Sequence, residues 1–120
     1  MSRFEHHRAY FRIKYPKAVR PVFAPAGQAK AAPVVDCCER GFRFALSDGT
    51  LARAVTGAPV EGELRFRDGG KVTVRGVIVR VQGGEAAVHL DAEPIPFKRI
   101  LSEQMFLRRR YPHADFRAVA

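Results

Sequence analysis

Two arginines near the start of the chain, Arg8 and Arg12, stand four residues apart in a basic segment. In an extended chain this spacing covers roughly 13 Å, enough for the two side chains to reach two sides of one nucleotide. A guanidinium donates paired hydrogen bonds to phosphate or to guanine O6 and N7, and it also stacks on base planes. The spacing alone is a weak signal, because basic chains also contain it in plain solvated arms.

A second polar group, residues 36–41 (Asp-Cys-Cys-Glu-Arg-Gly), lies between two runs of strand-forming residues. The carboxylate of Asp36 can accept hydrogen bonds from the N1 and N2 edge of guanine. Gly41 lets the backbone turn sharply or come close to a ligand, and Arg40 offers a guanidinium for stacking. By itself this segment is also an ordinary β-turn with a solvent-exposed arginine.

Cys37 and Cys38 are the two cysteines of the chain, and they are adjacent. Neighbouring cysteines rarely satisfy the geometry of a disulfide, so we expect free thiols. A metal site would need His6 or His7 from far along the chain, with no CxxC spacing to support it. The sequence therefore predicts neither a bound metal nor a cofactor.

Motifs of the common enzyme classes do not occur: the chain has no GxSxG, HExxH, Walker loop or GxGxxG. His89 alternates along an expected strand, which favours a half-buried structural role. The acids show no pairing that would support acid–base catalysis. We expect a protein that is not an enzyme.

The 120 residues suit one domain, and the net charge of +9 is concentrated at the two ends. Residues 1–30 contain seven Lys or Arg and one acid, residues 98–120 contain six and two, and the middle contains eight and nine. Basic ends favour contact with phosphate or an acidic surface. No apolar run approaches the roughly 18 residues of a spanning helix. Residues 1–8 lack the apolar region of a secretory signal, so we expect a cytoplasmic protein.

We expect an irregular basic arm over residues 1–17 and a folded domain over residues 18–120. Short strands separated by glycine-rich turns are predicted over residues 18–23, 34–37, 42–46, 62–66, 71–81 and 86–90. Pro21 marks the first of them as an edge strand, and Gly76 interrupts the valine alternation as a bulge would. Six strands at this spacing predict a small antiparallel barrel or sandwich, and of the two we expect the barrel.

A helix is predicted over about residues 96–110. Its apolar residues fall on one broad face, with Phe106 on the opposite and exposed side; the face is Phe97, Ile100, Leu101, Met105 and Leu107. Three arginines at its carboxyl end suit the helix macrodipole. The expected fold is therefore mainly β, a six-stranded antiparallel β-barrel with a C-terminal α-helix.

Together and in this order, the two polar groups resemble the signature of the PilZ domain family, bacterial receptors for cyclic di-GMP. That signature is RxxxR followed by (D/N)xSxxG. Arg8 and Arg12 match the first motif, and Asp36 and Gly41 match the second. The apolar residues around the second motif, the glycine-rich hairpins and the terminal helix extend the resemblance over nearly the whole chain.

The resemblance implies a split barrel whose RxxxR loop folds over its face onto the dinucleotide. It implies that the arginines bind phosphate and guanine, that Asp36 and residue 38 bind the base and nearby polar groups, and that a protein effector receives the signal without catalysis. Two positions depart from the family: Cys38 replaces the motif serine, and His7 stands where many members have a further arginine. A thiol is the weaker hydrogen-bonding group, so the affinity and the number of bound dinucleotides stay open.

Two alternatives remain open. A PilZ-like adaptor without ligand fits the loss of the motif serine at Cys38. A small basic barrel that binds nucleic acid fits the charged ends, but no strand carries the interleaved aromatic residues that stack bases, so nucleic acid is the less favoured partner. The expected partners are cyclic di-GMP and a protein effector, and the expected assembly is a monomer or weak homodimer.

Overall fold

The computed structural model describes residues 12–28, 30–46, 54–113 and 117–118. Its elements, in chain order, are β1 (Arg12–Lys14), the short 3-10 helix η1 (Lys17–Val19), β2 (Val22–Pro25), β3 (Ala32–Cys38), β4 (Gly41–Ala45), β5 (Pro59–Arg65), β6 (Lys71–Gln82), β7 (Glu85–Leu90), α2 (Phe97–Arg110) and β8 (Arg117–Ala118). No helix in this described part of the chain has the length and apolar character needed to cross a bilayer.

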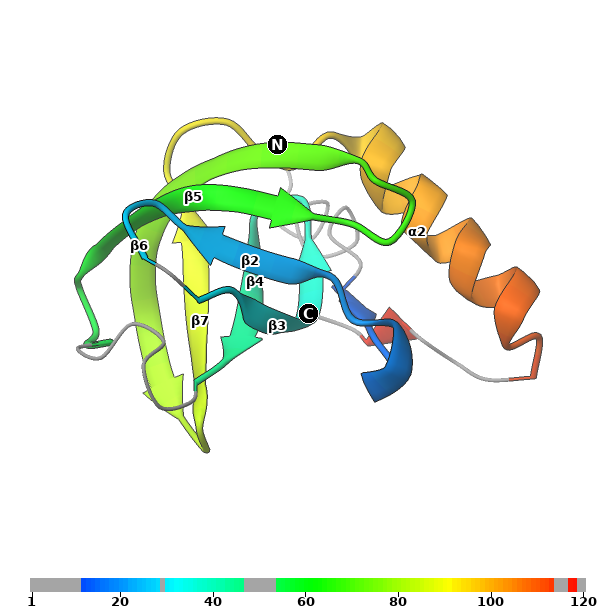
Figure 1. Ribbon diagram of the computed structural model, residues 1–120, viewed down its shortest axis with the longest axis horizontal. Helices are drawn as coiled ribbons and strands as arrows, with labels where there is room; N and C mark the ends of the chain where they lie inside the picture. The colour runs from blue at the N-terminus through cyan, green and yellow to red at the C-terminus, as the bar shows by residue number, and fades with distance from the viewer. Residues whose placement is uncertain (1–11, 29, 47–53, 114–116, 119–120) are drawn as a thin grey trace, which may run out of the picture.

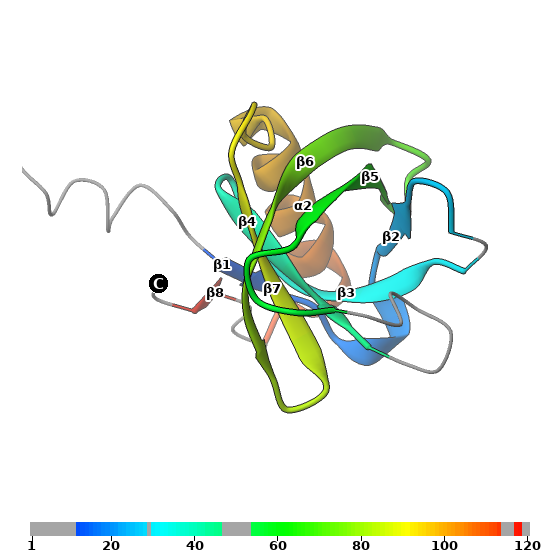
Figure 2. The same ribbon diagram turned by 90° about the vertical axis from the view of Figure 1, so that its left-hand side faces the viewer.

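Six strands close into an antiparallel barrel in the order β2-β5-β6-β7-β4-β3, because β3 pairs with β2 as well as with β4 (Figure 1). β1 pairs with the second half of β3, and β8 pairs with β1. Figure 2 shows the ring of strands, with α2 crossing the opening farther from the viewer. The fold class predicted from the sequence, a six-stranded antiparallel barrel with a C-terminal helix, is confirmed.

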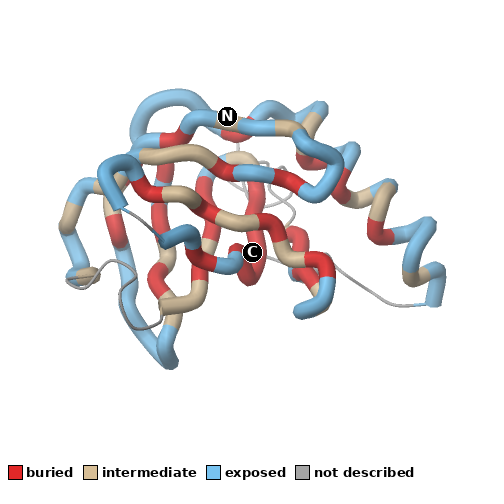
Figure 3. The backbone as a smooth tube through the Cα atoms, viewed as in Figure 1, coloured by how far each residue is buried: buried red, intermediate tan, exposed pale blue. Residues whose placement is uncertain are grey.

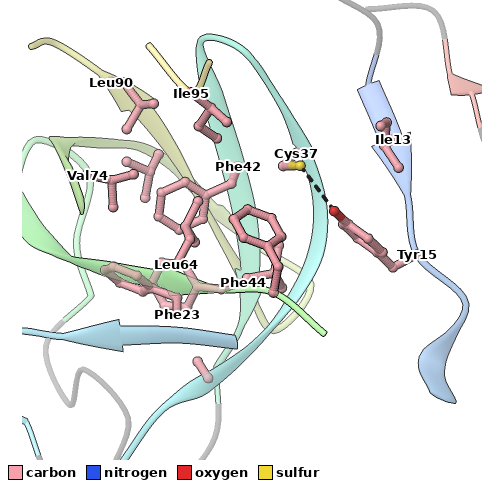
Figure 4. Close-up of a cluster of buried hydrophobic side chains, with 14 of the residues drawn as sticks. Ile13, Tyr15, Phe23, Cys37, Phe42, Phe44, Leu64, Val74, Leu90 and Ile95 are labelled. Atoms are coloured by element: carbon pink, nitrogen blue, oxygen red, sulfur yellow. Dashed lines mark hydrogen bonds between the residues drawn. The ribbon is translucent and has the colours of Figure 1, made fainter. Parts of the chain in front are cut away.

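Phenylalanines fill the barrel interior. The rings of Phe23, Phe42 and Phe44 pack with centroids 4.9 to 6.0 Å apart, one from β2 and two from β4 (Figure 4). Each is almost completely buried, and Figure 3 shows buried positions alternating with exposed ones along the strands. This inner face leaves the outer face of β3, β4, β6 and β7 for polar residues, as period-2 alternation requires.

The expected first strand over residues 18–23 is wrong in its bounds and in its edge position. Residues 17–19 form η1 instead, and β2 starts only at Val22, after Pro21. Proline lacks an N–H to donate, but the carbonyl of Pro21 accepts a hydrogen bond from the Val34 N–H at 2.8 Å. Pro21 therefore helps to close the barrel between β2 and β3 rather than marking an open edge.

The bulge in β6 lies three residues later than predicted. β5 and β6 stay in continuous register through Gly76, whose added Cβ would lie 2.1 Å from the carbonyl oxygen of His89. The register instead shifts between Ile78 and Arg80, where β6 pairs with β7. The bulge leaves Val79 51% exposed on the outer surface of the barrel.

The expectation of an irregular arm over residues 1–17 is wrong for residues 12–17, while residues 1–11 lie outside the described part. Ile13 of β1 pairs with Cys37 of β3, and both Ile13 and Tyr15 are buried in the core. Two alternating apolar residues are too short a signal for a strand in the sequence. β1 exists because β3 offers it an edge.

The helix bounds are confirmed to within one residue, and Ile100 and Leu107 are buried as predicted, but the rest of the predicted buried face is wrong. Ile100, Glu103 and Leu107 are buried, and Phe106 packs partly buried against the core. Phe97, Leu101 and Met105 are exposed instead. The barrel opening selects a helix face that includes a glutamate, and a charged residue reads as exposed in the sequence.

A buried polar cluster joins this helix to Tyr15, which follows β1, and to Cys37 of β3. The Tyr15 hydroxyl donates to Glu103 Oε1 at 2.8 Å and lies 3.5 Å from Cys37 Sγ (Figure 4). Arg99, whose guanidinium lies over the Phe66 ring at 4.7 Å, donates to Glu103 Oε2 at 2.9 Å. Burial raises the pKa values of Glu103 and Tyr15 and raises the pKa of Cys37 to about 12. Cys37 is therefore an unreactive thiol of the core.

Candidate ligand-binding groove

A cationic groove of about 440 Å³ lies on the outer face of the barrel, across β1, β3, β4, β6 and β7. None of the described residues that line the groove is acidic. The lining residues are Arg12, Lys14, Cys38, Arg40, Gly41, Phe42, Arg43, Val79, Arg80, Ala87, Val88 and His89. Five arginine or lysine side chains thus surround one hollow. This arrangement suits an anion with more than one charge, such as a compound with two phosphates.

Four of the residues singled out in the sequence meet in this groove: Arg12, Cys38, Arg40 and Gly41. They come from β1, the end of β3, the β3–β4 turn and the start of β4. His7 and Arg8 lie outside the described residues. The structure therefore unites the later arginine of the first motif with the second motif.

Asp36 lies beneath this surface rather than on it. Its side chain is completely buried, although it belongs to the outer face of β3. Arg12 Nη1 donates to Asp36 Oδ1 at 3.0 Å, Arg43 Nε donates to Oδ2 at 2.8 Å, and Arg43 Nη2 also contacts Oδ2. Both carboxylate oxygens accept from arginine and the side chain is completely buried, so in this geometry Asp36 holds two guanidiniums and is not exposed to a base in the groove.

A register shift in β3 places Asp36 and Cys38 on the outer side. The pairing with β4 is irregular between Val34 and Asp36, and Val34 is buried in the core. Simple alternation from Val34 would point Asp36 inward, so the extra residue moves it outward. It also turns Cys37 into the core and Cys38 toward the groove. Both thiols are free, as the sequence predicted, and both are buried.

Gly41 allows the floor of the groove to form. A Cβ at this position would lie 2.2 Å from the carbonyl oxygen of Val88, an overlap that the backbone of β7 could relieve only by moving. Gly41 pairs with His89 and Arg43 pairs with Ala87 across β4 and β7. Small residues thus let two strands approach closely while the longer side chains rise around them.

Arg43 is the most important residue that the sequence analysis missed. It lies two residues after Gly41 on β4, so period-2 alternation already puts both on one face. Its pKa is raised, mainly by hydrogen bonding to Asp36, and its Nη1 also lies 3.5 Å from Glu85 Oε1. The Arg43 side chain is 36% exposed, so it links the buried carboxylate to solvent in the groove.

The groove includes other residues that had no site signal. His89, expected to be half-buried and structural, is exposed on β7 and lines the groove. Lys14 follows Arg12 by two residues, a spacing that would have indicated a shared face had β1 been predicted. Val79 and Arg80 enter through the β6 bulge, and no pattern in the sequence indicated that displacement.

Comparisons with known proteins add no family to this picture. A scan against protein-family models finds no match, and a search of curated proteins finds none either. Within the described residues, no three His, Cys, Asp or Glu side chains are grouped so as to hold a metal ion. What the groove can bind is therefore argued from its own charges and shape.

Proposed function

We propose that the protein binds cyclic di-GMP in this cationic groove and passes its presence to a protein effector. The observation that carries the proposal is that Arg12, Cys38 and Gly41, three positions of the PilZ-like motifs, share one groove with Arg40 and further cations. Two phosphates match several guanidiniums, and the same groups pair with guanine O6 and N7 or stack on its plane. The protein is expected to act in the cytoplasm, as a monomer or weak homodimer.

The proposal assigns Asp36 a role different from the one that the resemblance implies. Its carboxylate, bonded to Arg12 and Arg43, acts from below as a positioning group for two guanidiniums. Such preorientation lowers the conformational cost of holding arginine around a ligand. Arg8, four residues before Arg12, is within roughly 13 Å of extended chain and is proposed as a further ligand contact.

The proposed relay to an effector runs through β1. Arg12 belongs to this strand, and Tyr15, one residue past its end, is hydrogen-bonded to Glu103 of α2. A ligand that draws Arg12 toward a phosphate would shift β1 and so change the geometry of the Tyr15–Glu103 hydrogen bond. Helix α2 is the element that such a change would reach.

Calorimetric titration with cyclic di-GMP, beside cyclic di-AMP and GTP, tests the proposal. Preference for cyclic di-GMP is expected, because adenine presents an N6 donor where guanine presents the O6 acceptor to arginine. Equal affinity for the two cyclic dinucleotides would reject guanine readout. Binding of any polyanion with a steep salt dependence would instead favour the nucleic-acid alternative.

A matched pair of arginines on β6 sharpens the test. Arg80 lines the groove and Arg75 does not, and both are exposed. Arg80→Ala should weaken cyclic di-GMP binding about tenfold, the effect of one lost charge-assisted contact, whereas Arg75→Ala should leave it unchanged. Equal effects of the two substitutions would point to bulk charge rather than to the groove.

Substitution of Cys38 tests the motif position itself. Cys38→Ser should tighten binding by up to about tenfold, because a hydroxyl is a better donor and acceptor than a thiol. Cys37→Ser should lower stability while intrinsic affinity stays nearly unchanged, since Cys37 lies in the core. If Cys38→Ser has no effect on affinity, residue 38 is not a ligand contact.

A further inference from the structure

Helix α2 carries an apolar stripe on the side that faces away from the barrel. Phe97, Leu101 and Met105 follow one another at four-residue intervals and are 53%, 42% and 51% exposed. This spacing keeps all three on one side of a helix about 21 Å long. Large apolar side chains aligned in this way have no role in the core, which α2 contacts through Ile100 and Leu107.

The same outer side of α2 is cationic. Lys98, Arg108 and Arg109 are exposed, and none of them forms an ion pair with the residues that the structure describes. The one acid of the helix, Glu103, is buried. Asp68 of the β5–β6 turn lines a hollow with Met105 and Arg109, but its carboxylate is paired with Arg99 at 3.0 Å. Apolar and cationic groups therefore share this face without an exposed acid on the helix.

The position of the helix leaves this face accessible. α2 lies along one side of the molecule in Figure 1 and crosses one end of the barrel in Figure 2. Figure 3 shows exposed positions recurring along its length. A flat surface could therefore meet the whole helix.

We propose that this face of α2 docks on an anionic phospholipid bilayer, with the helix parallel to the surface. Phe97, Leu101 and Met105 would enter the boundary between headgroups and acyl chains, while Lys98 and Arg109 would extend to the lipid phosphates. Cations near an anionic membrane add their attraction individually and need no fixed partner geometry. The negative charge of such a bilayer is complementary to the exposed cations of α2, and this favours a bilayer as the partner of this face.

Other occupants fit the face less well. A second copy of the chain would bring its own Lys98, Arg108 and Arg109 toward the same cations, and this repulsion opposes a symmetric dimer. A stable protein interface buries about 800 Å² on each partner, far more than three half-exposed side chains provide. A bilayer combines a small apolar contact with many charges, which is what this helix offers.

Co-sedimentation with vesicles tests the proposal. The full chain should bind phosphatidylglycerol–phosphatidylcholine vesicles and not vesicles of phosphatidylcholine alone, because the anionic lipid supplies the charge. The double variant Leu101→Ser/Met105→Ser should bind about tenfold more weakly. The control Val55→Ser/Val81→Ser removes exposed apolar residues elsewhere and should bind like the wild type.

A second measurement locates the contact directly. The chain contains no tryptophan, so Leu101→Trp introduces a single fluorophore on α2 and Val55→Trp introduces one at an exposed control site before β5. Quenching by brominated lipid at position 101 and not at 55 would support the proposal. No binding to anionic vesicles would overturn it and leave an acidic protein as the occupant. Equal loss on Arg80→Ala and Lys98→Ala would also overturn it, because binding would then depend on the overall charge of the protein and not on the face of α2.

Discussion

Two buried acids, Asp36 and Glu103, show how differently one fold can use a carboxylate. They are the charged residues that are buried in the described part of the chain, and each is bonded to arginine. Asp36 is held by two guanidiniums beneath the groove, whereas Glu103 has one guanidinium and a tyrosine hydroxyl beneath the helix. Compensation is therefore fuller at Asp36, and burial dominates at Glu103, where it raises the pKa.

The contrast shows that the effect of burying a carboxylate depends on how fully its charge is compensated by the groups around it. A buried ion pair is stable only while its partners remain, because an uncompensated charge in the interior is costly. The burial of Asp36 should therefore be tolerated only while both arginines remain. Neutralising Asp36 should in turn release Arg12 and Arg43, which line the groove. Glu103 should tolerate neutralisation better, because its burial disfavours the charged form and raises the pKa of the carboxyl.

The largest effect is expected for Arg43→Ala. The substitution leaves the completely buried Asp36 with Arg12 alone, and removal of one partner from a buried pair costs about 3 kcal/mol. Urea denaturation would measure the loss in the free energy of unfolding. Arg75→Ala, at an exposed ion pair whose atoms are 4.0 Å apart, is the control and should leave stability nearly unchanged.

Asp36→Asn should cost less, about 2 kcal/mol, because the charges it leaves belong to guanidiniums that reach solvent. The loss should be accompanied by weaker binding in the groove, since Arg12 and Arg43 lose the group that orients them. Thermal melting and calorimetry with cyclic di-GMP would measure the two effects. Unchanged affinity in a folded variant would show that Asp36 is structural only.

Tyr15→Phe should cost about 1 kcal/mol, the usual contribution of one buried hydrogen bond. The hydroxyl donates to Glu103 and lies beside Cys37, so both partners lose a contact while the ring stays in the core. Chemical denaturation would measure the change. A loss as large as that of Arg43→Ala would mean that the helix link, and not the groove cluster, is the more strongly coupled of the two.

Glu103→Gln is expected to have the smallest effect near neutral pH, within about 1 kcal/mol of wild type. The folded-state pKa of Glu103 is raised above its ordinary value of about 4.5, so the folded protein binds the proton more tightly than the unfolded chain. The stability contributed by this group is fully present below pH 4.5 and is lost as the pH rises through the folded-state pKa. Denaturation at several pH values should show wild type losing stability relative to Glu103→Gln above pH 4.5. A gain in that range would contradict the raised pKa.

Several features of the candidate site could be predicted from the sequence. Period-2 alternation puts neighbouring residues on opposite faces, as Cys37 in the core and Cys38 in the groove lining are, but which of the two faces inward depends on the register shift in β3. Gly41, expected where the backbone turns sharply or comes close to a ligand, follows the β3–β4 turn and lines the groove. The same alternation, continued by two residues from Gly41, would have placed Arg43 on the groove face. These are local consequences of backbone geometry, so the order of residues is sufficient to determine them.

The tertiary structure decided the rest, because the remaining choices depend on partners that are distant in the chain. β1 forms only on the edge of β3, the bulges of β3 and β6 depend on their pairing strands, and the barrel opening selects the face of α2. The sequence by itself determined a neutral, strand-rich middle between basic ends and the alternation within each strand. Only the closed barrel determined that Asp36 is buried under two arginines and that Glu103 is inside while Phe97 is outside. The physical reason is that alternation is a property of one strand, whereas burial is a property of what packs against it.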